Sequence, residues 1–224
     1  MKKYILAMTG ASGSIFGVRV LEELVKTSEV HLVISSNTFQ IIRDETGRDW
    51  VGSNQQKNEG TVPDLRTEQS EVVESGLSPW NSRLTENIIR EQFKTDRIFF
   101  YEDKQMEAPV ASGSFKTDGM LVVPCTMKTL SGIANGYANN LIERAADVVI
   151  KEGRPLLLSP REMPFSAIHL ENMLKLARLG VRIAPPVPAF YQGPKNLDDM
   201  VNFIIGKILD SFGVEHELFK RWGK

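Results

Sequence analysis

Tyr4-Ile5-Leu6-Ala7-Met8-Thr9-Gly10-Ala11-Ser12-Gly13-Ser14 is the stretch that decides the fold. Its first five residues are apolar and predict a buried strand, and the apolar residues of 15–25 recur at the spacing of one helix face. The glycines between them allow a tight turn. Free N–H groups at the helix start and the Ser12 and Ser14 hydroxyls predict a seat for a phosphate. A plain turn with a serine cap is the alternative.

The turn is not a standard dinucleotide or triphosphate motif. Residues 10–15 lack the third glycine or alanine of the dinucleotide fingerprint, and no Gly-Lys-Ser/Thr follows as in a P-loop. A mononucleotide such as FMN therefore suits the turn better than NAD or ATP.

Composition bounds the class of protein. The chain has 224 residues, a formal net charge of −1 and one cysteine, Cys125. This charge argues against nucleic acid or an anionic membrane as a partner, and a single cysteine excludes an internal disulfide framework. The basic start at 1–3 precedes too short an apolar run for a signal peptide, and no stretch approaches a membrane span. We expect a single domain over 1–224 that is soluble and cytoplasmic.

Apolar runs and amphipathic stretches alternate along the chain, which predicts a parallel sheet covered by helices on both faces. The further expected strands are 30–35, 97–101, 120–124, 155–159 and 181–184. The further expected helices are 37–46, 85–94, 126–134, 140–151, 166–179 and 197–212.

Residues 48–104 depart from this pattern. Their first part is polar, lacks periodicity and is punctuated by glycine and proline. We expect an inserted excursion here, in which Trp50 and Trp80 anchor an ordered contact; a disordered insert is the alternative.

Polar, small-residue segments follow four of the expected strands, at 9–14, 35–37, 125–129 and 160–162. Ligands of parallel α/β sheets bind at the carboxyl ends of the strands. The sequence therefore predicts one crevice lined by hydroxyls, glycines and cations.

Two cations share a face of the helix expected at 140–151. Arg144 and Lys151 lie two turns apart, and apolar neighbours suggest that the helix is largely covered. A phosphate-bearing substrate would supply the anion they need, although Glu143 and Asp147 are internal alternatives.

Other reactive side chains have plainer interpretations. Glu162 beside Arg161 is either an ion-pair member, which the sequence favours, or a general acid/base. Cys125 is expected to be a core thiol. His31 and His169 lack metal-ligand spacing, so we expect no metal site. The stiff apolar segment 185–191 ends in a phenol that is able to donate to an anion.

Several segments, taken in order, resemble the flavin prenyltransferase family, the UbiX-like proteins. They are Met8-Thr9-Gly10-Ala11-Ser12-Gly13, Ala111-Ser112-Gly113-Ser114, the stretches 139–148 and 160–174, Pro188-Ala189-Phe190-Tyr191 and Arg221-Trp222-Gly223. The resemblance covers nearly the whole chain except roughly 48–104.

The resemblance implies a Rossmann-like, flavodoxin-like three-layer sandwich with a mainly parallel sheet. It implies a homododecamer with the site between subunits. The reaction would join the dimethylallyl group of dimethylallyl phosphate to reduced FMN at N5 and C6, without metal. The product, prenylated FMN, would pass to a UbiD-type decarboxylase.

The matching motifs also imply residue roles. The residues expected to hold FMN are Gly10, Ala11, Ser12, Ser35, Thr126, Met127, Lys128, Thr129 and Arg161. The residues expected to bind the substrate are Ser112, Gly113, Arg144, Lys151, Tyr191, Lys207 and Trp222. Proton transfer would fall to Ser12, Glu45 and Glu162.

Two departures from the family pattern stand out. Met106 or Glu107 occupies a place where an aromatic residue is common, so a stacking partner is missing unless Trp50 or Trp80 replaces it. Lys207 stands where arginine is common, which keeps the charge and loses the bidentate fork.

Two rival functions stay open. One is an FMN-dependent decarboxylase of the related cysteine-decarboxylase family, against which the basic substrate set argues, since a carboxylate substrate needs no such cluster. The other is a non-catalytic FMN carrier subunit of an aromatic acid decarboxylase.

Overall fold

The computed structural model describes residues 1–52 and 82–221. Six strands form one sheet in the order β3-β2-β1-β4-β5-β6, with every neighbouring pair parallel. The strands are β1 (Lys3–Met8), β2 (Glu29–Ile34), β3 (Ile98–Glu102), β4 (Gly119–Cys125), β5 (Leu156–Pro160) and β6 (Arg182–Ile183). This is the Rossmann order, which reverses between β1 and β4. The expected parallel α/β fold is confirmed.

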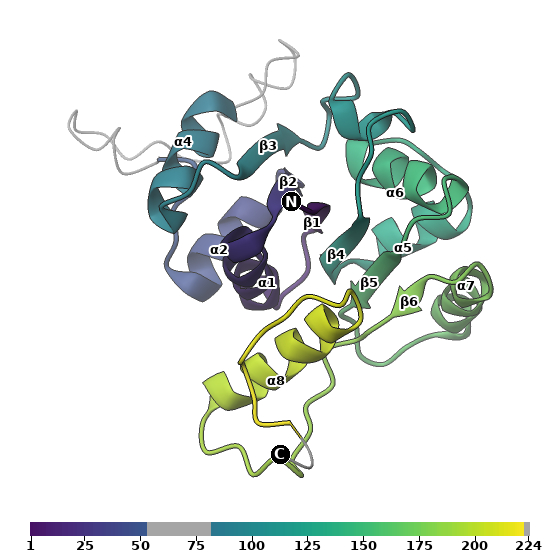
Figure 1. The fold of residues 1–224 in the computed structure, drawn as a ribbon. Coiled ribbons are helices and arrows are strands. Elements are labelled where there is room, and N and C mark those ends of the chain that lie inside the picture. Colours follow the sequence, from purple (N-terminus) through teal and green to yellow (C-terminus); the bar gives the residue numbers. More distant parts are fainter. Residues whose placement is uncertain (53–81, 222–224) are drawn as a thin grey trace, which may run out of the picture.

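Helices cover both faces of the sheet (Figure 1). They are α1 (Ser14–Thr27), α2 (Thr38–Thr46), α4 (Ser82–Phe93), α5 (Met127–Ala134), α6 (Leu141–Lys151), α7 (Ala167–Arg178) and α8 (Leu197–Asp210), with a 3-10 turn at Pro109–Ala111. Leu6 of β1 lies in a core shared with α1, α2, α4 and α8, whereas the next residue, Ala7, lies in a core shared with α5, α6 and α7. This alternation is the period of a strand buried on both faces. All expected elements within the described residues are found, with bounds shifted by at most three residues.

Gly17 allows α1 to pack closely on the sheet. A Cβ at this position would lie 2.3 Å from the carbonyl oxygen of Val123 and 3.0 Å from the sulfur of Met8. In dinucleotide-binding Rossmann proteins, the third small residue of the fingerprint provides this approach. In this chain Gly17, inside the helix, allows the same close approach. The approach places the start of α1 beside the ends of β1 and β4.

The described part of 48–104 packs into the fold. Trp50 is buried, packs edge-on against Phe93 and donates its indole N–H to Gln92. β3 pairs with β2 at the outer edge of the sheet, with Val30 opposite Ile98. The expected ordered contact of Trp50 is confirmed, and because Trp50 is enclosed in the core, the alternative that it replaces the missing aromatic near Met106 is wrong. Trp80 and the rest of 53–81 lie outside the described residues, and the single-domain boundary stays a prediction.

A membrane span would need a long, strongly apolar helix. Within 1–52 and 82–221, none of the helices meets both requirements.

Candidate active site

Thr9 ties together the carboxyl ends of the two central strands. Its hydroxyl donates to the carbonyl of Pro124 at 3.0 Å and accepts the N–H of Thr126 at 2.8 Å. Thr126 in turn caps α5 by accepting the N–H of Thr129 at 3.2 Å. On the other side of β1, the hydroxyls of Ser35 and Thr38 lie 2.7 Å apart. The segments expected to hold FMN therefore meet at one edge of the sheet.

This edge offers small, hydroxyl-bearing and cationic groups to a ligand. Gly10 and Ser12 are exposed, as are Lys128 and Arg161. Among the described residues, the Lys128 and Arg161 side chains make no hydrogen bond or ion pair. Exposed cations beside a helix start and small-residue turns fit the phosphate and ring of a flavin mononucleotide.

Glu162 does not form the ion pair that the sequence favours. Its carboxylate accepts the N–H of the following residue, Met163, at 3.0 Å, and no ion pair joins it to Arg161 in the part of the chain that the structure describes. The carboxylate is exposed at the end of β5 and free for other partners.

The Glu45 carboxylate occupies the start of α1. It accepts the Gly13 N–H at 3.0 Å with each oxygen, and Oε2 also accepts the N–H and the hydroxyl of Ser14, both at 2.7 Å. Partial burial opposes ionisation, but these bonds and one from the Ser12 hydroxyl outweigh it and lower the pKa of Glu45. The N–H groups predicted as a phosphate seat are thus filled by a carboxylate of the same chain.

No local sequence signal places Glu45 there. It comes from α2, 31 residues beyond Ser14, and the sheet topology alone brings it to the turn. The structure thereby joins Glu45 to Ser12, two of the three residues expected to transfer protons.

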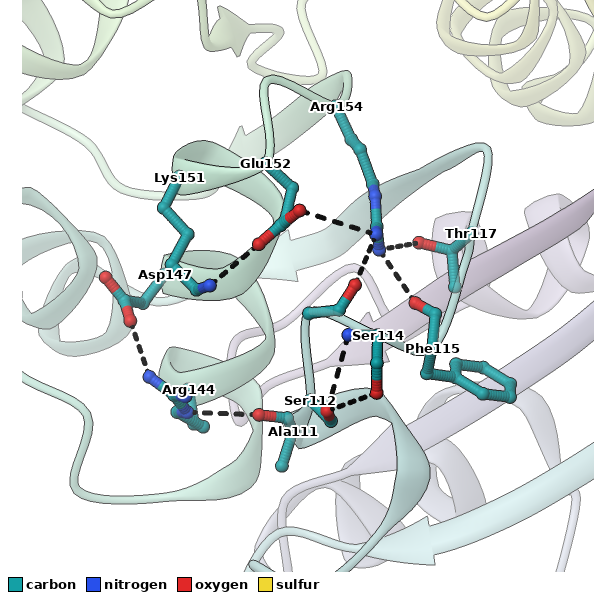
Figure 2. A network of polar contacts seen from close by, with 11 residues as sticks. Ala111, Ser112, Ser114, Phe115, Thr117, Arg144, Asp147, Lys151, Glu152 and Arg154 are labelled. Carbon is teal, nitrogen blue, oxygen red and sulfur yellow. Dashed lines mark hydrogen bonds and ion pairs between the residues drawn. The ribbon is translucent and has the colours of Figure 1, made fainter.

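A second group of polar side chains, the α6 cluster, gathers where α6 faces the loop that follows the 3-10 turn (Figure 2). It consists of Ser112, Gly113, Arg144, Asp147, Lys151, Glu152 and Arg154. Arg144 donates to the carbonyl of Ala111 at 3.2 Å and pairs with Asp147 at 2.8 Å. Lys151 pairs with Glu152 at 2.7 Å. Both expected phosphate-binding cations therefore carry a carboxylate partner in their own chain.

Arg154 holds the loop of the α6 cluster in place. Its guanidinium donates to the carbonyls of Gly113 and Phe115 at 2.7 and 2.8 Å. The Glu152 carboxylate lies over the same loop, because a Cβ added to Gly113 would come within 2.5 Å of its Oε1. The hydrogen bond from Lys151 lowers the pKa of Glu152. Sequence reasoning grouped Arg154 with the other cations late in the chain but did not assign it this role, and it missed Glu152, for which a run of charges after the helix was the only available signal.

Lys151 lies far from the carboxyl edge of its own sheet. It ends α6, and Arg154 just beyond contacts Thr117, which precedes β4. Lys207 lies in the last turn of α8, and Phe212 beyond it packs against Tyr4 at the start of β1. Both lysines thus lie toward the amino ends of the strands, and they lie on opposite faces, because α6 and α8 pack on different cores.

One chain therefore does not bring all the expected site residues together. β4 has seven residues, and a strand of this length spans about 20 Å, more than a lysine side chain bridges. Tyr191 is exposed and rests on Phe203 of α8. Trp222 lies outside the described residues.

The remaining reactive side chains have structural roles. Cys125 is buried, which raises the pKa of its thiol, and the expected core thiol is confirmed. His31 is enclosed between Glu29 and Tyr101, and His169 caps the start of α7. Residues 1–52 and 82–221 contain no group of three potential metal ligands among His, Cys, Asp and Glu.

Comparison with known proteins agrees with this geometry. Residues 1–209 match the Flavoprotein family, so the fold and the site define a flavoprotein. The UbiX flavin prenyltransferase of Methanocaldococcus jannaschii is 43% identical over 221 residues, which cover 99% of this chain and 98% of the relative. The chain belongs to the UbiX flavin prenyltransferase family.

Solved structures of similar proteins cover the same length. A dodecameric FMN-dependent UbiX-like decarboxylase from Escherichia coli O157:H7 is 41% identical, with a TM-score of 0.75, over 99% of this chain and 100% of that one. AnUbiX (PadA1), in complex with FMN and dimethylallyl pyrophosphate, is 35% identical, with a TM-score of 0.76, over 100% and 98%.

Proposed function

We propose that this protein is a flavin prenyltransferase that joins the dimethylallyl group of dimethylallyl phosphate to reduced FMN at N5 and C6. The observation that carries the proposal is the combination of a flavin-type carboxyl edge with cations that suit a phosphate, namely the exposed Lys151 and Lys207 and the half-buried Arg144. A similar protein is known with both FMN and a dimethylallyl phosphoester bound.

Two sets of residues would bind the two substrates. FMN would lie against Gly10, Ala11, Ser12, Ser35, Thr126, Met127, Lys128, Thr129 and Arg161. The phosphate of the prenyl donor would lie against Ser112, Gly113, Arg144, Lys151, Tyr191 and Lys207, with Trp222 completing that set.

The residues supply electrostatics, placement and proton transfer. Reduced FMN, when bound, supplies the nucleophilic atoms. Ionisation of an allylic phosphate leaves negative charge on the departing group, and fixed lysine and arginine side chains stabilise that charge without a metal ion. Glu45 holds a carboxylate beside the Ser12 hydroxyl, where it exchanges protons with the substrates; Glu162 is the second exposed carboxylate at the edge.

The two sets would meet only in an assembly. Lys151 and Lys207 of one subunit would reach the carboxyl edge of another, because each lies at the opposite end of its own sheet. Exposed apolar side chains on and beside α7, including Ile168, Leu174 and Leu179, support a subunit interface. A dodecamer, as found for the similar Escherichia coli protein, is the proposed assembly.

The product would serve another enzyme. Prenylated FMN is made here for a UbiD-type decarboxylase, and the cytoplasm is the proposed location because the chemistry needs reduced flavin.

The test is anaerobic incubation of the purified protein with reduced FMN and dimethylallyl phosphate in the presence of a metal chelator, followed by mass spectrometry of the released flavin. A flavin heavier by one five-carbon prenyl unit, with release of phosphate, is the expected result. Unmodified FMN despite tight FMN binding, with both the monophosphate and the diphosphate donor, would overturn the proposal.

A decarboxylase is the second candidate, since one similar structure carries that name. Release of carbon dioxide from an aromatic acid by the isolated protein, without any prenyl donor, would favour it. The carrier-subunit alternative predicts neither reaction.

A further inference from the structure

The buried hydroxyl of Ser14 contacts a carboxylate rather than capping its own helix. Ser14 is the first residue of α1 and has no exposed surface. The N-cap residue, Gly13, has no side chain with which to cap the helix. The Ser14 hydroxyl donates to Glu45 Oε2 at 2.7 Å. The helix start is therefore satisfied by Glu45, and the Ser14 side chain is left to serve that carboxylate.

The two oxygens of Glu45 are bound unequally. Oε2 accepts three donors at 2.7–3.0 Å, namely the Gly13 N–H, the Ser14 N–H and the Ser14 hydroxyl. Of these three donors, only the Gly13 N–H also bonds to Oε1, at 3.0 Å. Three donors use up the bonding capacity of one carboxylate oxygen, so Oε1 keeps the lone pair for a further proton or hydroxyl.

Fixing one oxygen orients the whole group. A carboxylate with one oxygen that accepts from both backbone and side chain cannot exchange its two oxygens by rotation without breaking charge-assisted hydrogen bonds. The Ser12 hydroxyl, which also bonds to Glu45, lies on the exposed turn of the same loop. The reactive side of the carboxylate is thus set by Ser14.

We propose that Ser14 is a positioning residue, which locks Oε2 of Glu45 to the first turn of α1 so that Oε1 stays free to exchange a proton. The proposal rests on the proposed function, within which Glu45 transfers protons. It adds a residue that acts through Glu45 and touches neither substrate.

The first test compares Ser14→Ala with the unmodified assembled protein. Loss of one hydrogen bond to a charged group predicts a turnover number about 10-fold lower, with the KM for dimethylallyl phosphate and the Kd for FMN changed by less than about 2-fold. Ser14→Thr keeps the hydroxyl and is expected to retain most of the turnover. Ser28→Ala is the matched control, since Ser28 is a buried serine at the other end of α1.

The second test needs no turnover. The infrared band of the Glu45 carboxylate is identified by its loss in Glu45→Gln. We expect this band to shift in Ser14→Ala and to stay in place in Ser28→Ala. If Ser14→Ala does not assemble, Ser14→Cys, which keeps the shape with a weak donor, takes its place.

Either readout is able to overturn the proposal. An unmoved infrared band, unchanged turnover, or an equal loss of turnover and FMN affinity would give Ser14 a purely structural role. Failure of the proposed function is a separate outcome, because it appears as absence of prenylated flavin in the unmodified protein, and the infrared test then still decides the role of Ser14.

Discussion

The carboxyl edge of the sheet and the α6 cluster are both polar, but different groups hold their side chains. At the edge, Glu45 is held mainly by the N–H groups of Gly13 and Ser14 and by a buried hydroxyl. In the α6 cluster, Arg144 and Lys151 are held by the side-chain carboxylates of Asp147 and Glu152, which lie on the same helix and at its end. Backbone donors are fixed, whereas side-chain counter-ions exchange.

This difference indicates that the carboxyl edge and the α6 cluster serve different functions. The edge is organised within one chain and needs no ligand to hold its shape, as suits groups that position a flavin and transfer protons. Under the proposed function, the cations of the α6 cluster would stay paired until a phosphate replaced the carboxylates. A phosphate-bearing substrate would then bind by exchange of counter-ions.

The largest expected effect comes from the α6 cluster. Lys151→Ala should lower turnover with dimethylallyl phosphate about 100-fold, because a fixed cation on the departing phosphate is lost. The Kd for FMN should stay within about 2-fold, because the proposed role of Lys151 is to bind the phosphate of the prenyl donor and not the flavin. Steady-state kinetics and flavin titration measure the two quantities.

Lys26→Ala is the control for this substitution. Lys26 is an exposed lysine of α1 that pairs with Glu23, also at 2.7 Å. Its loss should leave turnover unchanged. Equal losses of turnover and of FMN affinity in Lys151→Ala would show that the α6 cluster does not act separately from the carboxyl edge.

Substitutions of two glycines test whether the surroundings of the carboxyl edge are more rigid than those of the α6 cluster. Gly17→Ala should lower the free energy of unfolding by about 2 kcal/mol, because its Cβ meets a backbone carbonyl that cannot move. Gly113→Ala should cost less than about 0.5 kcal/mol, because its Cβ meets the end of the flexible Glu152 side chain.

Urea unfolding at one fixed protein concentration measures both changes, since the stability of an assembly depends on concentration. A similar cost at Gly17 and Gly113 would show that the edge is no more rigid than the α6 cluster.

Sequence patterns were sufficient for the layers of the fold and for the polar segments that meet at the carboxyl edge of the sheet. Apolar runs located the strands, and the rule that ligands lie at strand ends located Thr9, Ser35 and Thr126 together. These features depend on local periodicity and on one topological rule.

Features set by long-range packing were not predictable from the sequence. Glu45 reaches α1 from another helix, and Gly17 is defined by its contact with Val123. The separation of Lys151 from the flavin edge follows from the direction of α6, which the spacing of residues along one helix does not reveal.

The smallest expected effect concerns pH. The pKa of Glu45 lies below its ordinary value of 4.5 in the folded protein, so the unfolded state binds the proton more tightly. The stability that this carboxylate contributes is present above about pH 4.5 and is lost as the pH falls through the lower, folded pKa. For an exposed carboxylate at a helix start, it amounts to about 0.5 kcal/mol.

The free energy of unfolding of Glu45→Gln should accordingly differ from that of the unmodified protein near neutral pH and approach it in acid. Denaturant titrations at several pH values measure this difference, with Glu162→Gln as the control for a carboxylate without the helix-start donors. A difference that does not change with pH would contradict the helix-start account of Glu45.

The central claim is that each site combines the carboxyl edge of one subunit with the cations of another. Its most direct test is a hybrid assembly formed by co-expressing Glu45→Gln and Lys151→Ala subunits, each inactive alone, under separate affinity tags. If the two halves come from different chains, random mixing restores about a quarter of the unmodified activity, because that share of sites joins two intact halves. Activity no higher than that of the separate variants would contradict the claim, because a site built from one chain always carries one of the two defects.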